Sequence, residues 1–326
     1  MGKLHKTLLG TTLTLLVGVI ANGALAQIGS INSATVTARQ FNDVPGATLT
    51  LMSNYPSLIS FEEQNVSSPT GFANRDSWHF SNNNGVSSFS FSNSDAFTIT
   101  TDVTLTGDPI SPRKEAGIVF NNPLNDGGEF AVNTDGHEIV AFGGFLRFYA
   151  FPRVFNSGDT VTLGLTVFKD SNGKNAVIYM AKTATQCLVS PALEFDNIEQ
   201  GVVNGTTIGG FFQIVNSPSI TTNSGEAVFE NIHIGASDQD FDGVADSDDT
   251  CPNTPACSLV DNHGCSIGQL APCAGPASGG TWKNHGQFVA ATARAVNEFL
   301  ALRLISQSQA DAILSAASKS GCGSKK

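Results

Sequence analysis

The feature that most limits the possible fold is a two-residue alternation of apolar and polar side chains in many short runs between residues 27 and 235. In "FTITTDVTL", Phe97, Ile99 and Val103 fall on one face of an extended chain, because successive side chains of a strand point to opposite sides. Similar runs are "TLTLM", "SLISFE", "SFSFS", "AGIVF", "EFAVN", "EIVAFGG", "TVTLGLTVF", "AVIYMA", "IGGFFQIV" and "EAVFENIHI". Turn residues such as the Asn-Gly pair of "KDSNGKN" separate them. This pattern predicts a mainly β fold, an antiparallel β-sandwich or jelly roll.

Three parts of this segment carry a resemblance to a known fold: the opening "ISFEEQNVSSPTGF", the long middle strands and the closing "AVFENIHI". With them, residues 27–235 resemble the concanavalin-A-like sandwich of laminin-G domains, lectins and glucanases. The resemblance implies two packed antiparallel sheets. Because this fold hosts lectins, adhesive modules and hydrolases alike, it leaves the function open.

Residues 1–26 have the features of a secretory signal peptide. Lys3 and Lys6 precede an apolar stretch from Leu8 to Ile20, and "ALA" precedes Gln27 as a small-x-small cleavage site. The apolar stretch is shorter than the ~20 residues of a membrane-spanning helix. We therefore expect an exported, soluble protein without a transmembrane segment, in the extracellular space, the periplasm or at the cell surface.

The charge balance argues against two kinds of polyanionic partner. The chain has 17 Lys+Arg and 28 Asp+Glu, a net charge of −11, and no basic cluster. An acidic chain of this kind is not suited to nucleic acid or to anionic membranes.

An acidic run, "DQDFDGVADSDD", follows the last expected strand and contains six aspartates between Asp238 and Asp249. So many like charges repel one another unless a cation neutralises them. Carboxylates stand at loop positions 1, 3, 5, 9 and 12, with Gly243 at position 6, a spacing that wraps hard oxygen ligands around Ca²⁺. The expected ligands are Asp238, Asp240, Asp242, the backbone carbonyl of Val244, Asp246 and Asp249. The alternative is a solvated acidic linker.

Residues 236–265 resemble the thrombospondin type 3 repeat, D-x-D-x-D-G-x-x-D-x-x-D-x-C-P, since "DQDFDGVADSDDTCPNTP" matches that pattern. The resemblance implies calcium as the cofactor. The continuation "CPNTPACSLVDNHGC" is similar to the linker before the peptidoglycan-binding domain of outer-membrane-protein-A-like proteins. Only 61 residues follow Cys265, too few for that domain, so a cell-wall-binding role is not implied.

The last part of the chain has helical periodicity. After a Gly/Pro/Ser joint at residues 266–280, residues 281–326 place Phe288, Ala295 and Phe299 at helical spacing and predict a helical hairpin. Expected caps are Asn284 for the first helix and a Ser306–Gln309 capping box for the second. The tail resembles a "WKNHG" segment found beside type 3 repeats in bacterial exported proteins. Its Trp282 and His285 are interpreted as packing and capping residues.

Six cysteines suit three disulfides in an exported protein. We expect Cys251–Cys265 across a short loop and Cys273–Cys322 between the joint and the tail end, which leaves Cys187 with Cys257.

One cluster of carboxylates raises the possibility of catalysis. "EFDNIE" resembles the E-x-D-x-x-E strand of laminarinase-type β-glucanases. The resemblance implies Glu194 as nucleophile, Asp196 as its electrostatic partner and Glu199 as acid/base of a retaining hydrolase. Asn197 replaces an expected apolar residue, and the segment has a single tryptophan for sugar stacking, Trp78.

On this evidence we expect a calcium-binding, lectin-like surface or cell-adhesion protein that recognises a glycan or matrix ligand without turnover. The alternative is a β-glucanase-like glycoside hydrolase that uses Glu194, Asp196 and Glu199. A purely structural spacer is the third possibility. The ligand, the binding face, the role of the tail and the oligomeric state stay open.

Overall fold

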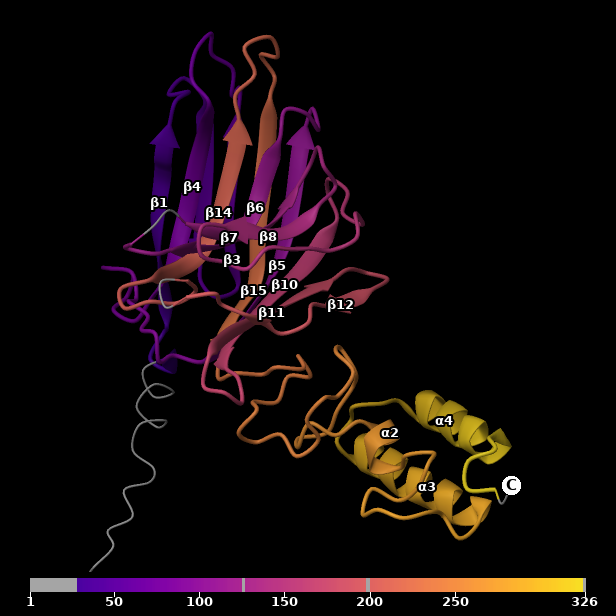
Figure 1. Cartoon of the computed structure of the whole chain (residues 1–326). Coiled ribbons are helices and arrows are strands. Elements are labelled where there is room, and N and C mark those ends of the chain that lie inside the picture. The colour runs from indigo at the N-terminus through magenta and orange to yellow at the C-terminus, as the bar shows by residue number, and fades with distance from the viewer. Residues whose placement is uncertain (1–27, 125–126, 198–199, 325–326) are drawn as a thin grey trace, which may run out of the picture.

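A computed structural model describes residues 28–124, 127–197 and 200–324 of the chain. Two antiparallel β-sheets pack face to face, and a disulfide-bonded loop region and a small helical unit follow at one end of them (Figure 1). The predicted mainly β sandwich with a stapled segment and a C-terminal helical hairpin is confirmed. The expected signal peptide at residues 1–26 lies outside the described residues.

The first sheet has seven strands in the order β1-β4-β14-β6-β7-β8-β9, and each neighbouring pair is antiparallel. Its strands are β1 (Ser33–Asn42), β4 (Ala73–Ser81), β14 (Thr207–Val215), β6 (Lys114–Asn121), β7 (Gly128–Asn133), β8 (Ile139–Gly143) and β9 (Tyr149–Ala150).

The second sheet has the order β12-β11-β10-β5-β15-β3-β2, with β13 also paired to β11. Its strands are β12 (Cys187–Val189), β11 (Asn175–Lys182), β10 (Thr160–Lys169), β5 (Phe97–Asp108), β15 (Ser224–Gly235), β3 (Leu58–Gln64), β2 (Thr48–Asn54) and β13 (Leu193–Glu194).

The core lies between the sheets and is rich in phenylalanine. The Trp78 ring meets Phe80 and Phe229 edge-on, at centroid distances of 5.2 and 5.9 Å, and all three side chains are buried. Each large apolar side chain removed from water contributes about 1.5–3 kcal/mol to folding. Packing across the two sheets therefore orders the strands and fixes which face of each strand points outward.

The helical unit contains α2 (Ile267–Leu270), α3 (His285–Ala301) and α4 (Gln307–Lys319). Its small core is formed by Val296, Phe299, Ile305 and Ala310. Both predicted caps are present: the Asn284 side chain accepts from the backbone N–H of Gln287, and Ser306 and Gln309 form the capping box.

All three predicted disulfides are present, joining Cys187 to Cys257, Cys251 to Cys265 and Cys273 to Cys322. The first ties edge strand β12 to the segment that follows the acidic run. Disulfides persist in oxidising compartments, in agreement with an extracellular setting.

The strand prediction was wrong for one run and incomplete for others. "SFSFS" forms only an isolated bridge between Phe91 and Thr206, although Phe89 and Phe91 are buried in the core. Strands β1 and β4 were not expected. In β4 the charged residues Arg75 and Asp76 stand on opposite faces, which weakens the apolar/polar alternation.

Candidate functional site

The acidic run forms a loop in which three carboxylates converge. Oxygen atoms of Asp238, Asp240 and Asp242 all lie within 4.8 Å of one another, as a shared cation would require. Asp238 is only 8% exposed, and its Oδ1 has no hydrogen-bond partner within the described part of the chain; the buried Oδ2 of Asp242 likewise has none. A buried carboxylate oxygen without a partner destabilises the folded state, and a cation bound at both atoms would remove this penalty.

Backbone N–H groups hold the other carboxylate oxygens in place. Gly243 donates to Asp238 Oδ2 at 2.9 Å, Val244 donates to Asp242 Oδ1 at 2.8 Å, and Thr254 donates to Asp240 Oδ2 at 2.7 Å. The turn needs Gly243, whose φ of +95° is unfavourable for residues with a Cβ. The predicted glycine at position 6 therefore has the expected role.

A fourth carboxylate, that of Asp249, lies beside these three. A Cβ on Gly264 would stand 2.1 Å from Asp249 Oδ1 and 2.9 Å from Asp242 Oδ2. Only glycine allows the backbone of the Cys251–Cys265 loop to approach both carboxylates so closely. The disulfide loop thus closes one side of the cluster.

Asp246, another expected ligand, lies outside the group of three converging carboxylates, and its role as a ligand stays a prediction. Asp246 accepts hydrogen bonds from Ser237 Oγ and from the backbone and side-chain nitrogens of Gln239, so its carboxylate is engaged at the edge of the loop. With Asp240 and Asp249 it lines a hollow of about 400 Å³ against β11. The backbone N–H of Val244 donates to Asp242, and the expected role of the Val244 carbonyl as a ligand stays a prediction.

The clustering has an electrostatic cost. Burial, together with the charges of Asp242 and Asp240, raises the pKa of Asp238 to about 7. Burial and the charges of Asp240 and Asp249 raise the pKa of Asp242 to about 6. In both groups burial is the larger cause and the neighbouring negative charge the smaller one, and a bound divalent cation would counteract both. The donor set, all hard oxygens, fits Ca²⁺.

The carboxylates of "EFDNIE" lie at the edge of the eight-stranded sheet rather than in its middle. Glu194 ends the two-residue strand β13 and pairs with Lys174 Nζ at 2.6 Å, while Asp196 pairs with Arg147. Their side chains are 46% and 66% exposed. Glu199 falls outside the described residues. Their catalytic role therefore stays a prediction.

The outer face of the seven-stranded sheet, the face turned away from the core, carries a polar network that the sequence analysis missed. Arg75 on β4 bonds Glu129 on β7 at 2.7 Å and Gln213 on β14 at 3.3 Å. Gln213 also donates to Glu115 on β6 at 3.4 Å. We call these four residues, Arg75, Glu115, Glu129 and Gln213, the outer polar network. The side chains of Arg75 and Glu129 are each 14% exposed and that of Glu115 is 11% exposed, little for charged groups on the outside of a sheet.

An apolar patch lies beneath this network. Phe211, Val119 and Ala131 form a separate cluster on the outer side, and the Arg75 guanidinium lies 4.1 Å from the centroid of the Phe211 ring. Such a cation–π contact, with the ion pairs, holds the arginine flat over the sheet. Burial and the charge of Glu129 raise the pKa of Glu115.

A histidine and an amide extend this face. His79 on β4 is 7% exposed, and its Nε2 lies 2.5 Å from the side-chain nitrogen of Asn121 on β6. Burial, with the charge of Arg75, lowers the pKa of His79 to about 4, so the ring is uncharged at neutral pH. The sequence contained one indication of this face: Arg75, Ser77 and His79 alternate along β4, so all three side chains lie on the same side of the sheet.

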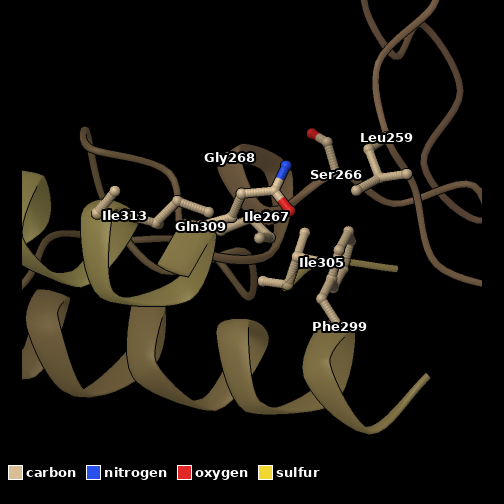
Figure 2. Close-up of a pocket in the computed structure, with 9 residues that line it drawn as sticks. Leu259, Ser266, Ile267, Gly268, Phe299, Ile305, Gln309 and Ile313 are labelled. Atoms are coloured by element: carbon tan, nitrogen blue, oxygen red, sulfur yellow. The ribbon is translucent and has the colours of Figure 1, made fainter. Parts of the chain in front are cut away.

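The helical unit contains an apolar hollow of about 500 Å³ between α2 and the α3–α4 turn (Figure 2). Leu259, Ile267, Phe299, Ile305 and Ile313 line it. The polar side chains at its rim, those of Ser266 and Gln309, already form helix caps. The hollow therefore offers mainly apolar contacts.

The "WKNHG" residues have structural contacts. Trp282 donates from Nε1 to the Pro272 carbonyl at 2.8 Å and packs edge-on against Phe288. The ring nitrogens of His285 face the carbonyl oxygens of Cys322 and Ser318 at 2.7 and 3.1 Å. These contacts agree with the packing and capping roles expected for both residues.

Within residues 28–124, 127–197 and 200–324, no helix is long and apolar enough to cross a membrane.

Comparison with known proteins gives structural similarity only. No family model and no curated protein matches the chain. Among solved structures, a family 7 alginate lyase in complex with its substrate matches at 9% identity and a TM-score of 0.40, over 66% of this chain and 97% of that one. The alginate lyase from Klebsiella pneumoniae matches at 10% identity and a TM-score of 0.40, over 65% of this chain and 98% of that one. A functionally unknown protein from Saccharomyces cerevisiae matches at 13% identity and a TM-score of 0.36, over 60% of this chain and 98% of that one.

The named enzymes act on a polysaccharide. The expectation of a lectin-like surface or adhesion protein without turnover, which leaned against an enzyme, is therefore corrected: the neighbours of this fold are carbohydrate-processing enzymes. At these identities the likeness concerns the fold alone, so any activity has to follow from the side chains of this chain.

Proposed function

We propose that the sandwich is a polysaccharide-processing domain and that its substrate lies on the outer face of the seven-stranded sheet. The observation that carries the proposal is the outer polar network, in which charged side chains are ordered and nearly buried on a face turned away from the core. Fixed ionic groups on an outer face are costly for stability alone, and they are typical of sites where a polar ligand is bound.

The chemistry of this face suits a sugar polymer. Arg75, Gln213 and Asn121 supply donors for hydroxyl or carboxylate oxygens, while Glu115 and Glu129 supply acceptors. His79 is uncharged above about pH 4, which is the form that accepts a proton. The alginate lyases named above act on such polymers, and we propose the same broad class of substrate here.

Incubation of the purified chain with alginate and, separately, with β-1,3-glucan tests the proposal. Unsaturated uronate products would indicate elimination, and new reducing ends without unsaturation would indicate hydrolysis. We expect His79→Ala and Arg75→Ala to lose at least about tenfold in rate, and Arg294→Ala, a change on the exposed surface of α3, to keep the wild-type rate. If Glu194→Gln abolishes turnover of β-1,3-glucan while His79→Ala does not, the site lies at "EFDNIE" instead. Absence of turnover on both alginate and β-1,3-glucan would contradict the proposal.

A second function, calcium binding by the acidic loop, has its own support. Asp238 is buried with an unpaired oxygen beside the carboxylates of Asp240 and Asp242. With Asp249 at position 12 and Gly243 at the turn, we propose a thrombospondin type 3-like calcium repeat in an exported protein, followed by the "WKNHG" helical tail. Calorimetric titration with Ca²⁺ tests this: Asp240→Asn should bind at least about tenfold more weakly than the wild type.

A further inference from the structure

The acidic loop also contacts the sandwich. Phe241 stands between two of the clustered aspartates in the sequence, and its side chain is only 7% exposed. It packs against Phe168, Ala176, Ile178 and Met180 on β10 and β11. We call these four residues the outer apolar strip.

The strip lies on the outside of the eight-stranded sheet. The intervening residues of the same strands, such as Leu165 and Tyr179, belong to the core between the sheets. Alternation along a strand therefore turns the strip residues outward, where water would otherwise meet them. Phe241 is a cover over an apolar surface of the sandwich.

Phe241 has a defined seat on this strip. A Cβ added to Gly164 on β10 would stand 2.9 Å from Phe241 Cε1 and 2.8 Å from Met180 Cε. The aromatic ring thus occupies the space above the one residue of β10 that has no side chain.

Backbone hydrogen bonds fix the same loop to the same sheet. The Asp238 N–H donates to Thr98 Oγ1 at 2.8 Å, and Thr166 Oγ1 donates to the Asp238 carbonyl at 2.8 Å. Asp238 therefore joins the strands through its backbone while its carboxylate joins the acidic cluster.

The two sides of the loop depend on one backbone conformation. Phe241 has a φ of +56°, in the left-handed region that residues with a Cβ rarely adopt. This turn places the carboxylates of Asp240 and Asp242 in the acidic cluster and the ring of Phe241 on the outer apolar strip. Repulsion among the carboxylates opposes the turn, and burial of Phe241 favours it.

We infer that calcium occupancy of the acidic loop controls whether Phe241 covers the outer apolar strip. The inference rests on the calcium site proposed above. A bound cation removes the repulsion that opposes the turn, so the covered state dominates; without the cation the loop leaves and the strip is exposed. Because coupling between two sites is reciprocal, loss of the Phe241 contact must also weaken calcium binding.

Hydrogen exchange on the full chain with its disulfides intact tests the coupling. Calcium binding is measured independently by calorimetry. We expect calcium to slow exchange in β10, β11 and residues 238–242, and chelation to increase the fluorescence of an apolar dye. If calcium binds but hydrogen exchange at β10 and β11 does not change, the calcium site is supported and the proposed control of the Phe241 contact is wrong. Absence of calcium binding would overturn both.

Two variants sharpen the test. Phe241→Ala should expose the strip with or without calcium and should bind calcium at least about fivefold more weakly, the lower end of typical coupling. Phe72→Ala, which removes a phenylalanine that is 58% exposed and distant in sequence from the loop, should behave as the wild type in both measurements. Unchanged calcium affinity in Phe241→Ala would contradict the coupling.

Discussion

The guanidinium of Arg75 reaches across two intervening strands, β14 and β6, to bond the carboxylate of Glu129 at 2.7 Å. On its way it covers the ring of Phe211, which is fully buried although it points away from the core. One side chain therefore neutralises a carboxylate and shields an apolar patch on the same face. Removal of the Arg75 side chain should therefore leave the Glu129 carboxylate unpaired and expose the patch around Phe211.

Arg75→Ala should destabilise the sandwich by about 3 kcal/mol, because breaking a buried ion pair leaves an uncompensated charge. Urea unfolding measures the change. The matched control is Arg153→Ala, which breaks an ion pair with Glu138 in which the arginine is 70% exposed, and which should cost less than about 1 kcal/mol. Equal losses in the two variants would argue against an ordered network around Arg75.

Glu63 should make the stability of the chain depend on pH. It is fully buried beside Arg39, and burial together with the charge of Asp76 raises its pKa to about 7. Between pH 4.5 and 7 the folded chain then holds a proton that the unfolded chain releases, so stability decreases as pH rises through this window.

Glu63→Gln should reduce this pH dependence, because an amide cannot titrate, while Asp238 and Asp242 continue to titrate in the same window. Thermal unfolding at pH 5 and pH 8 measures the difference for each variant. Glu62→Gln alters the neighbouring residue on the opposite face of β3 and should keep the wild-type dependence. An unchanged slope in Glu63→Gln would assign the effect to other groups.

Calcium should protect the acidic loop from proteolysis. At a calcium concentration ten times the dissociation constant, binding adds about 1.4 kcal/mol to the folded form, which is large for a segment with little core of its own. With chelator, cutting should concentrate between Ala236 and Pro252 and leave the sandwich intact. Asp240→Ala should be cut alike with and without calcium. If calcium leaves the wild-type pattern unchanged, the loop is a solvated linker.

The Cys251–Cys265 disulfide should support the same loop. It joins residues 14 apart, and closing a loop of this size contributes about 3 kcal/mol by the chain-entropy estimate. The joint substitution Cys251→Ser and Cys265→Ser should lower calcium affinity, because Gly264 then no longer holds the backbone against Asp249 and Asp242. Calorimetry on the double variant measures this. Loss of Cys273–Cys322, in the helical tail, should leave calcium affinity unchanged.

Local features of the sequence determined much of this protein. Two-residue alternation predicted the sandwich, caps at Asn284 and Ser306 predicted the helices, and the positions of six cysteines led to the correct three pairs. The spacing of Asp238, Asp240 and Asp242 predicted a cluster whose carboxylates do converge. These features depend on residues close in sequence or on a small number of possible pairings.

Only the tertiary structure decided which strands are neighbours, and the strand order created the side-chain clusters on both outer faces. Alternation places Arg75 and His79 on one face of β4, but nothing local indicates that β14, β6 and β7 will bring Gln213, Asn121 and Glu129 to them. The seat of Phe241 above Gly164 has the same origin, since the two residues are far apart in sequence. Side-chain periodicity specifies faces, whereas strand order follows from burying the whole core at once, so contacts between distant strands cannot be read from any single run.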